Sequence, residues 1–206
     1  VILIGFIGGT ALTRLLDARS ARAKEAAAYF IGGKITYSDV AEAQNQLNIL
    51  QRMGAPLILR SITLSAFGKQ QVPDFHSVLL GELLFTDQRT SPQVLSYLKQ
   101  TIQMQGYKVG LDQLYGLYNQ ENRVAFYWIL LLNEADQAGI RVSTATARNR
   151  LASALEGLQG VSYSSLMNSL VNPPAGSSMS GVSESEALEV FARLLSVVQY
   201  SKSVCS

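Results

Sequence analysis

The stretch VAFYWILLLNEADQAGIRVS, residues 124–143, gives the strongest indication of fold in this chain. Its first half is apolar on every side, as expected of a buried helix, and its following turns become polar. Gly139 stands where a left-handed helix cap is expected, and the Ser143 hydroxyl can cap a further helix. The stretch therefore predicts a central core helix over 120–138, a short connection, and another helix over 144–159.

The part LLLNEADQAGIRVS within this stretch resembles the pattern LLLxEAxxxGIxVS of a known family. That pattern is typical of the N-terminal domains of SurA-like and PpiD-like periplasmic chaperones, which belong to the parvulin-type prolyl isomerase family. The resemblance implies an all-α, mainly helical domain over residues 29–206, with one short β-hairpin and an insertion at about 56–120.

Composition narrows the class of protein. The chain has 206 residues, of which 48% are hydrophobic and 16% charged, so a folded core is expected rather than extensive disorder. Its net charge is only +2 and it has no basic stripe, which argues against a nucleic-acid partner. The single cysteine, Cys205, forms no internal disulfide and leaves the redox compartment open.

Glycines and capping residues mark the first elements. Gly32-Gly33 lies between two short β-prone runs and predicts a tight hairpin, in the place of the vNGxxIt segment of SurA-like chains. Thr36 or Ser38 then caps a helix over 38–53, for which Gly54 is the stop. In the expected insertion, helices are predicted over 74–85 and, from Ser91-Pro92, over 92–105.

The C-terminal third predicts two more helices around a loop. One lies within 161–171, and residues 172–181 are rich in proline, glycine and serine. Ser183 and Glu186 have the spacing of a capping box at the start of a helix over 184–200. The buried stripe of that helix is expected at Leu188, Phe191, Leu195 and Val198.

The segment VILIGFIGGTAL at residues 1–12 is apolar and is followed by Arg14, Arg19, Arg22 and Lys24. This order predicts that residues 1–28 form part of a transmembrane anchor and a juxtamembrane helix, since basic residues favour the lipid headgroups. A buried core helix is the alternative, because about 20 residues are needed to cross a bilayer. A secretory signal peptide is disfavoured by the charged residues at the position of a cleavage site.

No catalytic, cofactor or metal site is expected. His76 is the only histidine and reads as a surface or helix-start residue, whereas parvulin catalysis, by resemblance, needs paired histidines in a separate domain. One histidine and one distant cysteine do not form a metal-ligand cluster. Whether the protein is an enzyme stays open, because the resemblance is to an isomerase family.

The predicted function is that of a membrane-anchored envelope chaperone that binds unfolded or extended polypeptide. By the resemblance it belongs at the bacterial inner membrane, facing the periplasm, with envelope client proteins and the lipid bilayer as partners. Phe126, Tyr127 and Trp128 are the candidate peptide-binding residues, and core packing is the alternative for them. Two other functions stay open: a structural subunit of a membrane complex, and the N-terminal part of a longer prolyl isomerase.

Overall fold

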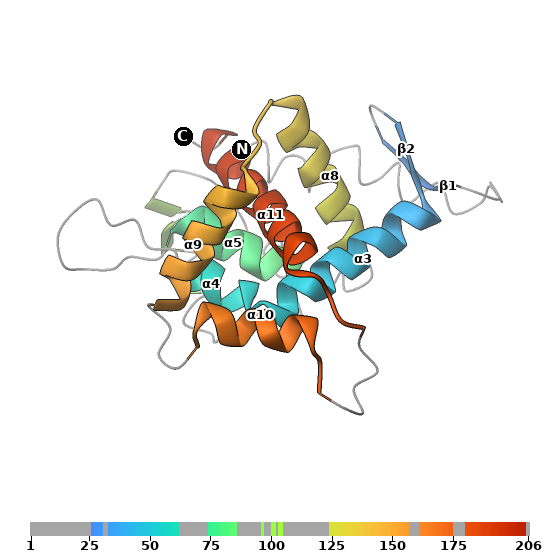
Figure 1. Ribbon diagram of the computed structural model, residues 1–206. Helices are drawn as coiled ribbons and strands as arrows, with labels where there is room; N and C mark the ends of the chain where they lie inside the picture. The colour runs from blue at the N-terminus through green and yellow to red at the C-terminus, as the bar shows by residue number, and fades with distance from the viewer. Residues whose placement is uncertain are drawn as a thin grey trace.

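The secondary structure follows from local capping signals. The computed structural model describes residues 26–30, 33–61, 74–85, 124–156, 161–174 and 180–204, with single helical residues at 96, 100, 101, 103 and 104. Within these ranges the protein is mainly helical, with one antiparallel pair of strands (Figure 1). The predicted helical class is therefore confirmed. The five single residues are all helical, in agreement with the helix expected over 92–105.

The hairpin consists of β1 (Ala26–Phe30) and β2 (Gly33–Thr36). Tyr29 pairs with Lys34 and Phe30 with Gly33, so Gly33 of the predicted Gly32-Gly33 turn lies in β2, and the register shifts between Ala26 and Ala28. Because β1 begins at Ala26, residues 26–28 are strand and not the end of the juxtamembrane helix predicted within residues 1–28. A small apolar cluster holds the hairpin against α8.

Helix α3 (Tyr37–Arg52) begins and ends at predicted positions. Thr36 is the N-cap, and it forms a capping box in which the Thr36 hydroxyl accepts from the Asp39 backbone N–H at 3.2 Å. The Asp39 carboxylate in turn accepts from the Thr36 backbone N–H at 2.7 Å. Gly54 has φ of 75°, a left-handed conformation that suits glycine, and it ends the helix.

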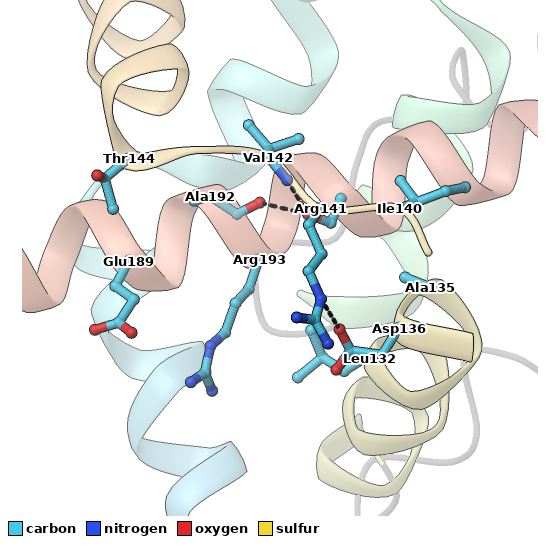
Figure 2. A pocket seen from close by; sticks show the side chains of 11 residues that line it. Leu132, Ala135, Asp136, Ile140, Arg141, Val142, Thr144, Glu189, Ala192 and Arg193 are labelled. Carbon is cyan, nitrogen blue, oxygen red and sulfur yellow. Dashed lines mark hydrogen bonds and ion pairs between the residues drawn. The ribbon is translucent and has the colours of Figure 1, made fainter. Parts of the chain in front are cut away.

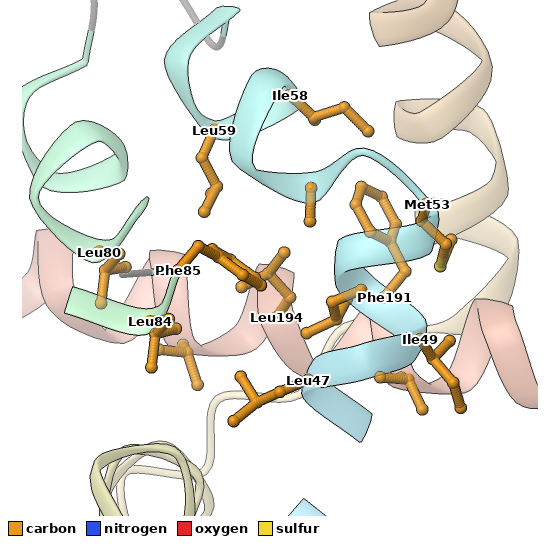
Figure 3. Packing of buried hydrophobic residues seen from close by; sticks show 14 of the residues in the cluster. Leu47, Ile49, Met53, Ile58, Leu59, Leu80, Leu84, Phe85, Phe191 and Leu194 are labelled. Atoms are coloured by element: carbon orange, nitrogen blue, oxygen red, sulfur yellow. The ribbon is translucent and has the colours of Figure 1, made fainter. Parts of the chain in front are cut away.

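Helices α4 (Ala55–Ser61) and α5 (Phe75–Leu84) come from the region expected to be an insertion. Their apolar side chains belong to the main core, where Ile58, Leu59 and Leu80 are almost fully buried. Figure 3 shows Phe85 near Leu194 of the last helix, and Leu59, Leu80 and Phe191 belong to the same core cluster. The two helices therefore build the core itself.

Three helices follow in the second half of the chain: α8 (Val124–Gln137), α9 (Thr144–Glu156) and α10 (Tyr163–Val171). Gly139 has φ of 69° after α8, as predicted. The Ser143 hydroxyl accepts from the Thr146 backbone N–H at 3.1 Å at the start of α9. Ser162 caps α10 in the same way, accepting from Ser165 at 3.1 Å.

The central helix of the molecule is α11 (Glu184–Val204), not α8. It contacts α3, α5, α8, α9 and α10, and it crosses the middle of the view in Figure 1. The predicted stripe is buried at Leu188, Phe191 and Val198, but burial extends to small and polar residues on other sides of the helix. Helix α8 lies in the core as predicted, with Trp128 fully buried, but α11 contacts more of the neighbouring helices and also buries Ala187, Ala192 and Ser196, so α8 is not the central helix.

Among the helices that the structure describes, none combines the length and the apolar character required to cross a bilayer. Residues 1–25, on which the membrane anchor is predicted, lie outside the described residues.

Candidate functional site

The three predicted peptide-binding residues of α8 point in different directions. Trp128 is fully buried in the main core, and Tyr127 is 94% buried there. Phe126 is half-buried and packs with the hairpin cluster. The structure therefore does not bring these side chains together on one surface, and Trp128 and Tyr127 lie in the core as the alternative predicted.

Trp128 also fixes the interface between α8 and α3. Its indole N–H donates to the Gln46 side-chain oxygen at 2.8 Å, and the Gln46 amide donates to Glu42 Oε1 at 2.8 Å. Glu42 lies 3.8 Å from the Arg193 guanidinium of α11. A chain of polar contacts thus runs from the core to the surface across three helices.

That surface is the rim of a cleft between the α8–α9 connection and α11, with a volume of about 480 Å³ (Figure 2). Its size falls within the ~300–1,000 Å³ typical of ligand pockets. The lining residues come from the end of α8, the connection, the start of α9 and the middle of α11: Leu132, Ala135, Asp136, Ile140, Arg141, Val142, Thr144, Glu189, Ala192, Arg193 and Ser196.

The connection between α8 and α9 is fastened to α11 through a buried serine. The Ser196 hydroxyl accepts from the Val142 backbone N–H at 3.0 Å and donates to the Ala192 carbonyl at 3.1 Å. At the other end of the connection, the Ile140 N–H donates to the Ala135 carbonyl at 2.9 Å. These bonds position one wall of the cleft on a rigid helix.

Charged groups surround the apolar part of the cleft. Arg141 Nε donates to Asp136 Oδ1 at 3.1 Å, and both side chains are exposed. Arg193 has Glu42 as its neighbour at 3.8 Å. Glu189 is exposed one helical turn before Arg193, and Figure 2 shows both side chains on the same side of α11. The cleft therefore combines apolar side chains with both signs of charge.

A second polar cluster joins α5 to the C-terminal end of α11. Asp74 caps α5 through its Oδ2, which accepts from the Ser77 N–H at 3.2 Å and from the Ser77 hydroxyl, and Lys202 Nζ lies 3.0 Å from the same oxygen. Burial alone raises the pKa of Asp74, but His76, Ser77 and Lys202 together hold that pKa well below its ordinary value. The Asp74 carboxylate is therefore ionised, and it is held by its contacts with Ser77 and Lys202.

This cluster does not have the geometry of a hydrolase. The Ser77 hydroxyl donates to Asp74 instead of to His76, whose Nδ1 is 3.8 Å from the same carboxylate. A serine nucleophile requires a histidine base on its own hydroxyl. The position of His76 in the first turn of α5 agrees with the predicted helix-start residue.

A third cluster joins α9, α10 and the N-terminal end of α11. Glu184 Oε1 accepts from Arg148 Nη2 at 2.6 Å and from the Tyr163 hydroxyl at 2.7 Å. The Arg148 guanidinium also lies over the Tyr163 ring, 5.9 Å from its centre. Burial, and then the Glu184 carboxylate, raise the pKa of Tyr163 to about 12. Arg148, Tyr163 and Glu184 thus interact with one another, as side chains in a structural contact do.

Sequence reasoning singled out the α8–α9 connection but missed its partners on α11. The sequence did contain one signal for these partners: Glu189 and Arg193 are four residues apart, a spacing that puts both side chains on one face of a helix. Within the described ranges, no group of three or more histidine, cysteine, aspartate or glutamate side chains is arranged to hold a metal ion.

Comparison with family models, with curated proteins and with solved structures finds no match to this chain.

Proposed function

We propose that the chain is a polypeptide-binding chaperone domain whose described residues carry out no chemistry, and that the cleft between the α8–α9 connection and α11 holds an extended segment of the client. One observation carries the proposal: the cleft lies at the stretch whose residues resemble the SurA-like and PpiD-like N-terminal domains. Six of its eleven lining residues lie between Leu132 and Val142.

The composition of the cleft supports binding of a polypeptide better than catalysis. Leu132, Ile140 and Val142 offer apolar contacts, while Arg141 and Glu189 offer polar ones at the rim. Peptide sites commonly combine apolar contacts with a few polar groups that fix orientation. A cleft of this size accommodates a short part of an unfolded chain, so binding is expected to be weak and reversible.

The finer parts of the proposal rest on the resemblance. They are a SurA-like fold, a membrane anchor formed by residues 1–28, and a place at the bacterial inner membrane with the domain facing the periplasm. The apolar run before a basic flank supports the anchor. Client proteins of the cell envelope are then the partners, and a downstream parvulin domain would make the chain the N-terminal part of a prolyl isomerase.

Peptide titration followed by NMR tests the proposed cleft. An unfolded, mixed-composition peptide is expected to shift the backbone signals of residues 140–144 and 189–196. Thr144→Tyr narrows the cleft from an exposed position and is expected to weaken binding, whereas Ala145→Tyr changes the adjacent exposed residue outside the lining and is expected to leave it unchanged.

Equal binding by both tyrosine variants would place the peptide elsewhere. Absence of binding, together with purification from membranes in a fixed ratio with other chains, would replace the proposal with the alternative of a structural subunit.

A further inference from the structure

Resting on the function proposed above, we propose that the cleft selects polypeptide segments that carry a lysine or arginine, and that Glu189 is the residue that recognises the cation. Of the charged side chains that line the cleft, the two arginines each have a carboxylate neighbour, whereas Glu189 has no basic neighbour within ion-pair distance in the described part of the chain.

Both cations of the cleft lie beside a carboxylate. Arg141 is hydrogen-bonded to Asp136 at 3.1 Å. Arg193 lies 3.8 Å from Glu42, a longer contact between two side chains that are partly open to solvent. An incoming anion would have to compete with Asp136 or Glu42, so these arginines are poor sites for an acidic segment.

Glu189 differs from the other carboxylates around the cleft. In the part of the chain that the structure describes, it lies within ion-pair distance of no lysine or arginine. Its side chain is exposed on α11, where it lines the cleft. A ligand cation can therefore pair with Glu189 without displacing a partner.

The four charged residues that line the cleft, Asp136, Glu189, Arg141 and Arg193, sum to zero, and Glu42 beside Arg193 adds one negative charge at its edge. Because the pair would form near solvent, its effect is modest. Exposed ion pairs change affinity by about two- to five-fold, and the effect falls at high salt.

Three peptides of the same length and the same apolar residues test the inference, with two lysines, two glutamines or two glutamates at matched positions. We expect the lysine peptide to bind about two- to five-fold more tightly than the glutamine peptide at low salt. Glu189→Gln is expected to abolish this difference, and Glu189→Lys to reverse it. Glu156→Gln removes an exposed carboxylate outside the cleft and should preserve it.

Each contrary result has a distinct meaning. Equal affinities for the three peptides, tighter binding of the glutamate peptide, or a lysine preference that survives Glu189→Gln would overturn the inference and leave polypeptide binding intact. If none of the three peptides binds, the proposed function fails as well.

Discussion

Near its C-terminal end α11 is joined to the cap of α5 by an ion pair whose carboxylate, Asp74, is buried. Near its N-terminal end it is joined to α9 by an ion pair that is open to solvent. Both contacts use one carboxylate and one basic side chain at hydrogen-bonding distance. Their surroundings differ, because Asp74 is 1% exposed while the side chains of Arg148 and Glu184 are 55% and 41% exposed. Burial, more than the distance between the charged atoms, is expected to decide how much each ion pair contributes to the free energy of unfolding.

The cleft uses the middle of α11, from Glu189 to Ser196, where Glu189 and Arg193 are exposed and most of the other side chains are buried. A helix held firmly at its buried end can present exposed charged side chains along its middle. The buried contact with Asp74 is thus expected to contribute mainly to stability, and the exposed charges at the middle of α11 to recognition.

The largest expected effect comes from the core that both ends share. Trp128→Ala removes a fully buried ring and its bond to Gln46, and it should lower the free energy of unfolding by about 3–5 kcal/mol. Trp128→Phe keeps most of the volume but leaves the Gln46 oxygen unpaired, so a loss of about 1–3 kcal/mol is expected. Urea unfolding followed by circular dichroism measures both, and a negligible loss for Trp128→Ala would show that this core is not a major source of stability.

At the buried end, Asp74→Ala removes the cap of α5 and leaves Lys202 and two Ser77 donors without their acceptor. The expected loss is about 2–4 kcal/mol, from the capping and the unsatisfied-donor costs together. Lys202→Met keeps the cap and should cost less. If Lys202→Met costs as much as Asp74→Ala in chemical denaturation, then the ion pair matters more than the capping.

Acid should weaken the buried end selectively. The pKa of Asp74 in the folded protein is below its unfolded value of about 3.9, so its stabilising effect is complete above that value and declines as the pH falls below it. Between about pH 5 and about pH 2 the native protein should therefore lose more stability than Asp74→Asn, which has no such carboxylate. Denaturant midpoints across this range supply the measurement, and parallel curves would contradict the prediction.

The smallest effect is expected at the exposed end. Glu184→Gln still accepts hydrogen bonds but removes the charge, and it should change stability by less than about 1 kcal/mol. Thermal unfolding at low and at high salt is the measurement. A loss comparable to that of Asp74→Ala would remove the distinction between the two ends.

The helix boundaries were largely predictable because their signals act within one turn. Thr36, Ser143 and Ser162 each accept a hydrogen bond from a backbone N–H three residues later. Gly54 and Gly139 adopt the positive φ that their positions suggested. Such contacts depend on neighbours in sequence, and sequence reasoning has access to those neighbours.

The importance of α11 was not predictable from hydrophobicity. The buried hydroxyls of Ser196 and Ser201 donate to carbonyls of their own helix, Ala192 and Val198, which satisfies both hydroxyls within α11, and Ser196 also accepts from the Val142 N–H. A pattern that counts serine as polar assigns these positions to solvent. The hydrophobic α8, by contrast, keeps half-buried residues along one side.

The candidate cleft was predicted only in part, for a similar reason. The connection through Ile140 and Val142 was identified from its glycine and serine signals. The residues that complete the cleft, Glu189 and Arg193, lie on a helix brought there by packing. No local rule joins residues so far apart in sequence, and the same holds for Asp74 and Lys202.

The position of Trp128 has a practical consequence. It is the only tryptophan of the chain, and it is fully buried where α8 packs on α3, and it is not among the residues that line the cleft. The intrinsic fluorescence of Trp128 therefore reports on whether α3 and α8 separate. The emission spectrum should shift to longer wavelength when the core opens, and acrylamide should quench it poorly while the core is closed. A ligand that fills the cleft without loosening the core should leave this fluorescence unchanged, which distinguishes binding from unfolding without any added label.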